Sequence, residues 1–379
     1  MKQRDFFELV SGRKTGAWAA ILRLLLRFAS FFFWLGAWAR LILFKKGFIK
    51  GTKVDVPIIC VGNLTTGGTG KTPAVAYVVK YLQELGRKPA IISRGYKAGK
   101  DGNDELQVLN ELCPGVPHVQ NPNRTAAAQK AILDGADILV MDDGFSHLKL
   151  ARDLNILLFD ALNPFGYGRM LPRGLLREPL KSCSRAQFAV FTRADAASKD
   201  RLRDLEDTIR CNAFEGGIAH AAHLPDELSS IGVPPMSSDV HPARQPTVET
   251  TVGTHRQDAD GTFKLKDSKV AALCGIGNPR GFEATLQQAG AEVKAILALD
   301  DHAEFNDAEI NTQILPYIEE QKNAGATAII VTQKDAVKLR AKVEALDLPL
   351  PMFELKVKLG FLTGEQELRE VIKQAISNG

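Results

Sequence analysis

One glycine-rich stretch constrains the fold of this chain more than any other feature of its sequence. Residues 62–73 read GNLTTGGTGKTP, directly after the apolar run PIICV at 57–61. A helical pattern follows from Ala74 to Leu85, and a second apolar run lies at 88–93. A buried strand, a glycine-rich turn, a helix and another strand in this order predict a phosphate-binding loop in a mostly parallel α/β sheet.

The chemistry of such a loop is specific. Successive backbone N–H groups wrap a phosphate chain, and the helix N-terminus adds its positive dipole end. Lys71 is expected to reach the β- and γ-phosphates, and the Thr72 hydroxyl to ligate Mg²⁺. The usual motif has glycine where this chain has Thr65. A glycine-rich turn without a ligand is the alternative. The residues expected to bind the nucleotide are Thr65, Thr66, Gly67, Gly68, Thr69, Gly70, Lys71 and Thr72.

A pair of acids follows another apolar run. Residues 136–141 read ADILVM, and Asp142 and Asp143 come next. An acid at the carboxyl end of a strand beside a phosphate loop commonly gives Mg²⁺ a second contact. Open α/β sheets bind ligands outside the carboxyl ends of their strands, so we expect the loop and the acids to converge. An ordinary Asp-Gly turn is the alternative interpretation.

Three further polar residues lie downstream, and spacing alone gives them no firm role. His147, in DDGFSH, is on this basis a structural histidine. Arg177 and Glu178 stand just before a proline in LPRGLLREP. An arginine there could neutralise the charge of a transferring phosphate, and a glutamate could join a metal shell. Spacing alone favours a surface Arg–Glu pair.

The net charge of +4 hides an uneven distribution. Residues 9–54 contain nine Lys or Arg, no Asp or Glu, and all three tryptophans. Within 17–44 the longest uncharged run has 12 residues, whereas a bilayer span needs about 20. We therefore expect a helix in the membrane interface, with Phe and Trp sunk and cations at anionic phospholipid head groups. A helix packed on the body and a true span are the alternatives.

Composition excludes several other classes of protein. Five scattered cysteines without a CxxC pair fit a reducing cytosol and argue against a zinc or disulfide scaffold. The body is net acidic and the basic segment is strongly apolar, which argues against nucleic-acid binding. No obligate protein partner is evident.

The length of 379 residues predicts about two domains. Residues 224–262 are rich in Pro, Ser and Thr and predict a linker or excursion, with His223, His241 and His255 solvated. The expected organisation is a basic amphipathic helix segment at 1–54, a phosphate-loop domain at 55–223, a polar linker at 224–265 and a smaller α/β domain at 266–379.

The ordered set of motifs resembles the tetraacyldisaccharide 4′-kinase family. GNLTTGGTGKTP, SRGY at 93–96, DDGFSH, LREP, GIGNP at 275–279, DDH at 300–302 and VTQKDAVKL occur in the family's order. The resemblance implies transfer of the γ-phosphate of ATP, with Mg²⁺, to the 4′-hydroxyl of an acylated glucosamine disaccharide 1-phosphate, which gives lipid IVA. It implies two α/β/α sandwich domains, the first of P-loop NTPase type, and an N-terminal membrane-interface helix. The implied location is the cytoplasmic face of the bacterial inner membrane.

The resemblance also implies roles for individual residues. Lys71 and Thr72 match the loop lysine and the Mg²⁺-binding threonine, and the acid pair matches carboxylates near Mg²⁺ and nucleotide. The implied catalytic residues are Asp104, His302, Arg177, Lys71 and His147, and the implied metal ligands are Thr72, Asp142, Asp143 and Glu178.

The family's base is an aspartate assisted by a histidine. The stretch GNDEL at 102–106 places the base on Asp104, with Asp101 as the alternative, and Asp301-His302-Ala303 supplies the histidine. A positioned carboxylate can accept the proton of a sugar hydroxyl as the P–O bond forms, and a histidine can orient it and tune its pKa. If the two residues lie on different domains, domain closure completes the base and excludes water.

Two other functions stay open on the residues alone. A P-loop kinase or GTPase-like enzyme with another substrate has no use for the apolar N-terminal segment. A partner-binding switch ATPase needs only a positioned water and no base at Asp104.

Overall fold

The computed structural model describes residues 3–95, 104–231, 263–300, 303–344, 346 and 348–377. It divides into two compact units. Unit 1 comprises Met1–Leu224, Ile276–Asn278 and Val357–Gly379, and unit 2 comprises Pro225–Gly275 and Pro279–Lys356.

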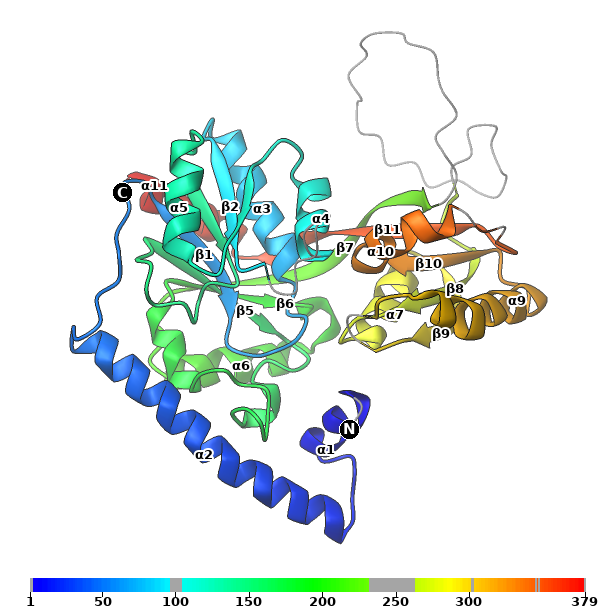
Figure 1. Cartoon of the computed structure of the whole chain (residues 1–379), viewed down its shortest axis with the longest axis horizontal. Coiled ribbons are helices and arrows are strands. Elements are labelled where there is room, and N and C mark those ends of the chain that lie inside the picture. Colours follow the sequence, from blue (N-terminus) through cyan, green and yellow to red (C-terminus); the bar gives the residue numbers. More distant parts are fainter. Residues whose placement is uncertain are drawn as a thin grey trace. The chain divides into compact units, whose positions relative to one another are not determined.

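Unit 1 is built on a parallel sheet in the strand order β3-β2-β4-β1-β5-β6-β7 (Figure 1). Most of these strands are buried along their whole length, because helices cover both faces, and their sequences are accordingly near-continuous apolar runs. The strands are β1 (Ile58–Asn63), β2 (Pro89–Ser93), β3 (His118–Gln120), β4 (Ile138–Asp142), β5 (Leu154–Asp160), β6 (Phe188–Thr192) and β7 (Gly217–Ile231). The predicted mostly parallel α/β class is thus confirmed.

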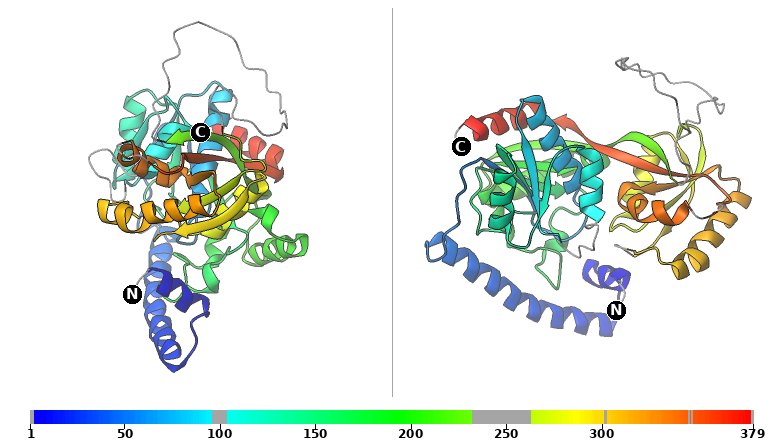
Figure 2. Two further views of the ribbon diagram at one scale, coloured as in Figure 1. Left: turned by 90° about the vertical axis from the view of Figure 1, so that its right-hand side faces the viewer. Right: turned by 45° about the horizontal axis from the view of Figure 1, so that its top comes forward.

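The connections place helices on opposite faces of this sheet. The step from β1 to β2 and the step from β3 to β4 run in opposite directions along the strand order. Right-handed crossovers then put α3 (Lys71–Glu84) and α5 (Arg124–Leu133) on opposite faces, as both figures show (Figures 1 and 2). The other helices of this unit's body are α4 (Asp104–Leu112), α6 (Lys199–Cys211) and α11 (Glu365–Ser377), with short 3₁₀ turns at Gly166–Gly168, Leu180–Arg185 and Ala194–Ala196.

The N-terminal segment is helical, as expected. It forms α1 (Gln3–Ser11) and the long α2 (Ala17–Lys45). Within the described residues, α2 is the one helix long and apolar enough, by length and composition, to cross a membrane. It exposes Trp18, Ile21, Leu24, Leu25, Phe28, Phe31, Phe32, Phe33, Trp34, Leu35, Trp38 and Leu43.

Unit 2 carries the end of the strand order, where the parallel pairs are β8 with β9, β8 with β10 and β10 with β11. Its strands are β8 (Lys269–Cys274), β9 (Glu292–Ala298), β10 (Ala328–Thr332) and β11 (Met352–Thr363). Its helices are α7 (Pro279–Gln288), α8 (Asp307–Glu309), a π-helical turn at Ile310–Ile314, α9 (Leu315–Asn323) and α10 (Gln333–Val343).

The chain returns to unit 1 at its C-terminal end, which differs from the predicted domain at 266–379. The strands β7 and β11 both run across the boundary, and α11 belongs to unit 1. The reason is packing on α3: the rings of Tyr77 and Phe361 lie 4.8 Å apart, and Arg369 donates to the Tyr77 hydroxyl at 3.0 Å. A local sequence pattern carries no signal for contacts of this range.

The region predicted as a linker at 224–265 also differs from expectation. The strand β7 continues to Ile231, so His223 lies inside a strand and not in solvated chain. His241 and His255 lie outside the described residues.

Candidate active site

The phosphate loop joins β1 to α3, where the sequence placed it. Gly67 and Gly70 have φ values of 116° and 79°, in the left-handed region that favours glycine. Two side chains hold the loop: Thr192, from β6, donates to the Thr69 carbonyl at 3.0 Å, and Asn63, at the end of β1, donates to the Thr65 carbonyl at 2.8 Å. The cradle is therefore fixed by tertiary contacts as well as by its glycines.

The acid pair lies beside this loop. The register pairs Val61 of β1 with Asp142 of β4, so the carboxyl ends of the two strands are adjacent. Asp143 follows with a φ of 50°, an uncommon backbone conformation of a kind that gathers at functional sites. The predicted convergence of loop and acids is present in the geometry.

Arg177 joins the loop to the acid pair. Its guanidinium donates to both carboxylate oxygens of Asp143, at 2.9 and 2.7 Å. It also donates to the backbone carbonyl of Asn63 at 3.0 Å and to that residue's side-chain oxygen. Lys71 reaches the same Asn63 oxygen at 3.5 Å. The prediction of a surface Arg–Glu pair, which spacing favoured, is wrong. Arg177 donates hydrogen bonds to Asn63, the last residue of β1.

The two acids differ in protonation. Burial, with Glu105 and Asp143 nearby, raises the pKa of Asp142 to about 7. Burial also opposes ionisation of Asp143, but Lys71 and Arg177 outweigh it and hold the pKa of that carboxyl well below its usual range. Asp143 is thus a fixed anion already matched to Arg177, whereas Asp142 lacks a full countercharge.

The Asp142 carboxylate keeps one oxygen that a cation such as Mg²⁺ can bind. Its Oδ1 is buried and accepts no hydrogen bond from the described part of the chain. No cluster of three His, Cys, Asp or Glu side chains suited to a metal occurs among the described residues. A carboxylate, a threonine hydroxyl and phosphate oxygens are the hard ligands that Mg²⁺ takes, with water completing the shell.

Glu178 is paired with two cations. It is 1% exposed, and its oxygens contact Arg185 at 2.6 Å and Arg40 at 3.4 Å. Arg185 also lies 4.5 Å over the ring of Phe145. Two cations therefore occupy the carboxylate that the resemblance assigned to metal.

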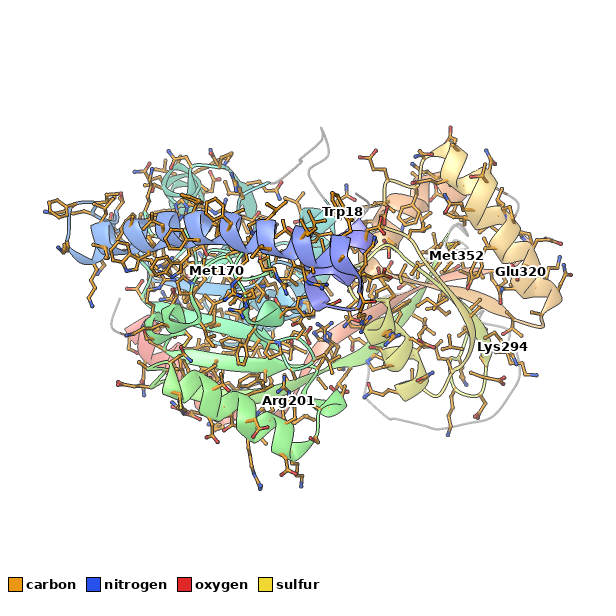
Figure 3. All side chains as sticks on the ribbon, turned by 90° about the horizontal axis from the view of Figure 1, so that it is seen from below. Trp18, Met170, Arg201, Lys294, Glu320 and Met352 are labelled. Carbon is orange, nitrogen blue, oxygen red and sulfur yellow. The ribbon has the colours of Figure 1, made fainter. Side chains whose placement is uncertain are left out.

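Arg40 belongs to α2, so the apolar N-terminal helix contacts the site loops directly. Arg40 donates to the Ser146 carbonyl at 2.7 Å. Ser30 donates to the Met170 carbonyl at 2.9 Å and accepts from the Arg173 backbone at 2.9 Å. Figure 3 shows Met170 beside the middle of α2, with Trp18 at the helix's N-terminal end. The loop that carries Arg177 and Glu178 is thereby attached to α2.

Of the remaining residues predicted for the site, the structure describes Asp104 and His147. Asp104 begins α4 and accepts from the Glu105 backbone at 3.2 Å. Asp101 and His302 lie outside the described residues. His147 is partly buried, and burial together with Arg124 lowers its pKa to about 4, so its ring is neutral at pH 7.

Sequence reasoning missed several residues of the site. Arg124, at the start of α5, is buried, and its charge acts on both Asp142 and Asp143. Arg193, just past β6, donates to the Gly68 carbonyl at 2.8 Å. His223 lies against Gly70, because a Cβ at that glycine would be 2.3 Å from the His223 Nε2. No local pattern marks these residues, since strand order brings each to the loop from a distance.

Comparison with known proteins gives a consistent result. The family model described as LpxK, tetraacyldisaccharide-1-P 4′-kinase, matches residues 22–377. Proteins named tetraacyldisaccharide 4′-kinase from Halothermothrix orenii and Anaeromyxobacter sp. (strain Fw109-5) are each 34% identical, over 88% and 97% of this chain and 88% and 95% of their own.

A solved structure agrees. It is described as the "apo" form of LpxK from Aquifex aeolicus in complex with ATP, with a TM-score of 0.66 and 26% identity. The match covers 94% of this chain and 99% of that one. With the loop, the acid pair and Arg177 in the arrangement described above, the chain belongs to the tetraacyldisaccharide-1-P 4′-kinase family.

Proposed function

We propose that this protein transfers the γ-phosphate of ATP to the 4′-hydroxyl of tetraacyldisaccharide 1-phosphate. The observation that carries the proposal is the meeting of Lys71, Arg177 and the acid pair at the ends of β1 and β4 in a chain that matches the family over 22–377. Kinase activity and a place in lipid A synthesis follow from that membership, and the Aquifex aeolicus relative is described with ATP. A soluble metabolite kinase and a switch ATPase are correspondingly disfavoured.

Each side chain has a task in this reaction. The loop backbone from Thr65 to Gly70 binds the phosphate chain, and Lys71 supplies positive charge to it. Arg177, held in place by Asp143, neutralises charge that spreads over the transferring group. Bound through Asp142 and Thr72, Mg²⁺ would add further neutralising charge at the phosphate oxygens. Glu178, which the resemblance gives as a further metal ligand, orders the loop through Arg185 and Arg40.

The base is a second part of the proposal. Asp104 would accept the proton of the 4′-hydroxyl, with His302 orienting that carboxylate and His147 lying near the reacting groups. The support is the family motif and the position of Asp104 at the start of α4. Equal losses in kcat/KM for Asp104→Ala, His302→Ala and the double variant are expected for a dyad that acts as one unit. Fully additive losses would contradict this assignment.

The membrane assignment is a third part. The exposed apolar side chains of α2 would lie in the interface of an anionic phospholipid membrane, which the resemblance places at the cytoplasmic face of the inner membrane. The contacts of Ser30 and Arg40 with the site loops support this role, because they hold the phosphate loop's neighbours next to the helix that would meet an acylated substrate.

One assay tests the reaction itself. Purified protein in detergent micelles receives labelled ATP, Mg²⁺ and tetraacyldisaccharide 1-phosphate, with Lys71→Ala as the blank. A labelled bisphosphorylated lipid is expected from the wild type alone. Absence of that product, with ATP binding intact, would refute the proposed substrate.

A further inference from the structure

The strand order places different strands on the two sides of the phosphate loop. The acid pair stands at the end of β4, on one side of β1, whereas β5, β6 and β7 lie on the other side. A triphosphate with its γ-phosphate near Asp142 and Lys71 therefore directs its nucleoside away from β4. The residues on the β5–β7 side, rather than those at the acid pair, are the ones available to it.

That side carries a built cluster around Arg193. Its Nε donates to Asp160 at 2.9 Å, and its Nη2 donates to the Gly68 carbonyl at 2.8 Å. The preceding residue, Thr192, is buried and donates to the Thr69 carbonyl. Arg193 has a φ of 54°, so the chain accepts an uncommon backbone conformation to place this cation. The end of β6 is thus tied to the apex of the phosphate loop.

His223 completes this cluster from β7. Phe191 pairs in register with His220, so His223 stands level with the residues just past the end of β6. Its Nε2 points at Gly70, is buried, and makes no hydrogen bond to any residue that the structure describes. Burial, together with Arg193, lowers the pKa of His223 to about 4, so the ring is neutral at pH 7.

A buried ring nitrogen without a hydrogen bond is unfavourable unless a ligand binds it. A neutral imidazole can donate or accept one hydrogen bond, which suits the hydroxyl and ring-nitrogen groups of a nucleoside. A phosphate would favour a cationic ring instead, and Arg193 works against that charge. The chemistry of the site therefore matches the uncharged end of a nucleotide.

We propose that His223 binds the nucleoside of ATP through Nε2. Arg193 positions the His223 ring, because it holds Gly68 of the phosphate loop against the β7 side. The inference rests on the proposed use of ATP and extends it from the phosphates to the nucleoside. Gly70 is then required twice, for its left-handed backbone and for the space that the His223 ring needs.

Calorimetric titration of the full chain with ADP and with inorganic tripolyphosphate, both with Mg²⁺, tests this. One lost hydrogen bond of about 1.4 kcal/mol is a tenfold change in affinity. His223→Ala is expected to weaken ADP about tenfold and to leave tripolyphosphate within twofold of wild type. His223→Asn keeps a hydrogen-bonding group and is expected to recover part of the ADP affinity.

The matched control is His220→Ala, which removes another histidine of β7 that already contacts Glu206 and Thr363. It is expected to keep both affinities. Equal weakening of ADP and tripolyphosphate by His223→Ala, or unchanged ADP binding, would overturn the inference. Lipid phosphorylation by the wild type is scored separately, so a wrong lipid substrate would leave the ADP result interpretable.

Discussion

The ion pair between Arg177 and Asp143 offers the sharpest test of the site. Arg177→Met keeps an unbranched apolar stem and removes the charge and all of the hydrogen bonds of the side chain. Asp143 then loses two charge-assisted bonds at 2.9 and 2.7 Å, and the Asn63 carbonyl loses a donor at 3.0 Å. Lys71 and Arg124 remain as cations that keep Asp143 ionised.

The expected loss of stability follows from exposure. The side chains of Arg177 and Asp143 are 24% and 37% exposed. Exposed pairs contribute about 0–1 kcal/mol, and breaking a fully buried pair costs about 3–5 kcal/mol. An intermediate loss of about 2 kcal/mol is expected, which lowers Tm by about 4–8 °C in a domain of this size. Asp143 stays ionised far below neutrality and Arg177 far above it, so this pair does not itself titrate between pH 6 and 8. Asp142, whose pKa burial raises to about 7, also interacts with Arg177, so the loss should be larger at pH 8 than at pH 6.

The expected loss of activity is much larger. An arginine that neutralises a transferring phosphoryl group contributes about 10³–10⁵-fold. We therefore expect kcat/KM to fall at least about 10³-fold in Arg177→Met, with a smaller fall in Arg177→Lys, which keeps charge but not the bidentate geometry. Both are measured by transfer of labelled phosphate to the lipid and by thermal melting.

The matched control is Arg340→Met in unit 2. Arg340 pairs with the buried Glu354 at 2.7 Å, so the variant removes an ion pair of similar length in the unit that does not contain the phosphate loop. It is expected to lower Tm and to keep kcat/KM at 25 °C. If both variants lost the same small amount of activity, Arg177 would have only a structural role, and the reasoning above would be refuted.

Three further predictions concern the loop and the buried histidines. Gly70→Ala would place a Cβ 2.3 Å from His223 at a φ of 79°, so ADP binding should be lost by calorimetry, and a second change, His223→Ala, should restore it only in part. Thr192→Val removes the donor to Thr69 and Phe159, and should lower stability by about 1–3 kcal/mol in urea unfolding while weakening ADP. Burial, with Arg124, lowers the pKa of His118 to about 4, so the unfolded chain binds the proton first and stability falls as pH drops from about 7 to 4. The pH dependence caused by His118 amounts to at most about 3 kcal/mol. The free energy of unfolding in urea, measured at pH 7 and pH 5, should change less with pH in His118→Gln than in the wild type. An equal change in both proteins would contradict the lowered pKa of His118.

The phosphate loop and the acid pair were predictable because local sequence determines them. A continuous apolar run before GGTGKT, and another before Asp142, predict buried parallel strands, and parallel strands bring their carboxyl ends to one edge. The observed pairing of Val61 with Asp142 follows from these two strands alone, without contacts from other parts of the chain. Family motifs, rather than spacing, were needed to bring Arg177 to this edge.

The features that could not be predicted depend on contacts between distant segments. The sequence does not show that α2 and the turn at Leu180–Arg185 place Arg40 and Arg185 on Glu178. His223 lay in a polar stretch, yet the length of β7 carries it to Gly70. In each case a residue's neighbours are set by where an element ends, which hydrophobic periodicity locates only to within a few residues.

The exposed face of α2 leads to a prediction about the membrane. Phe28 and Phe32 are 67% and 56% exposed, and their rings lie 5.1 Å apart, so they form one apolar surface. Burying a large apolar side chain contributes about 1.5–3 kcal/mol. Losing two of them should therefore cost at least about 3 kcal/mol, or roughly a hundredfold in membrane partitioning.

The double variant Phe28→Ser/Phe32→Ser should thus leave anionic phosphatidylglycerol vesicles in a sedimentation assay. Leu133→Ser, on α5 and 86% exposed in the parent chain, should stay bound like the wild type. Basic side chains at the head groups add about 1 kcal/mol each and are screened by salt. Release of the wild type by 1 M salt therefore supports a helix in the interface. Retention in salt and in alkaline carbonate would instead show a helix that spans the bilayer, and equal binding of the double variant would remove α2 from the membrane contact altogether.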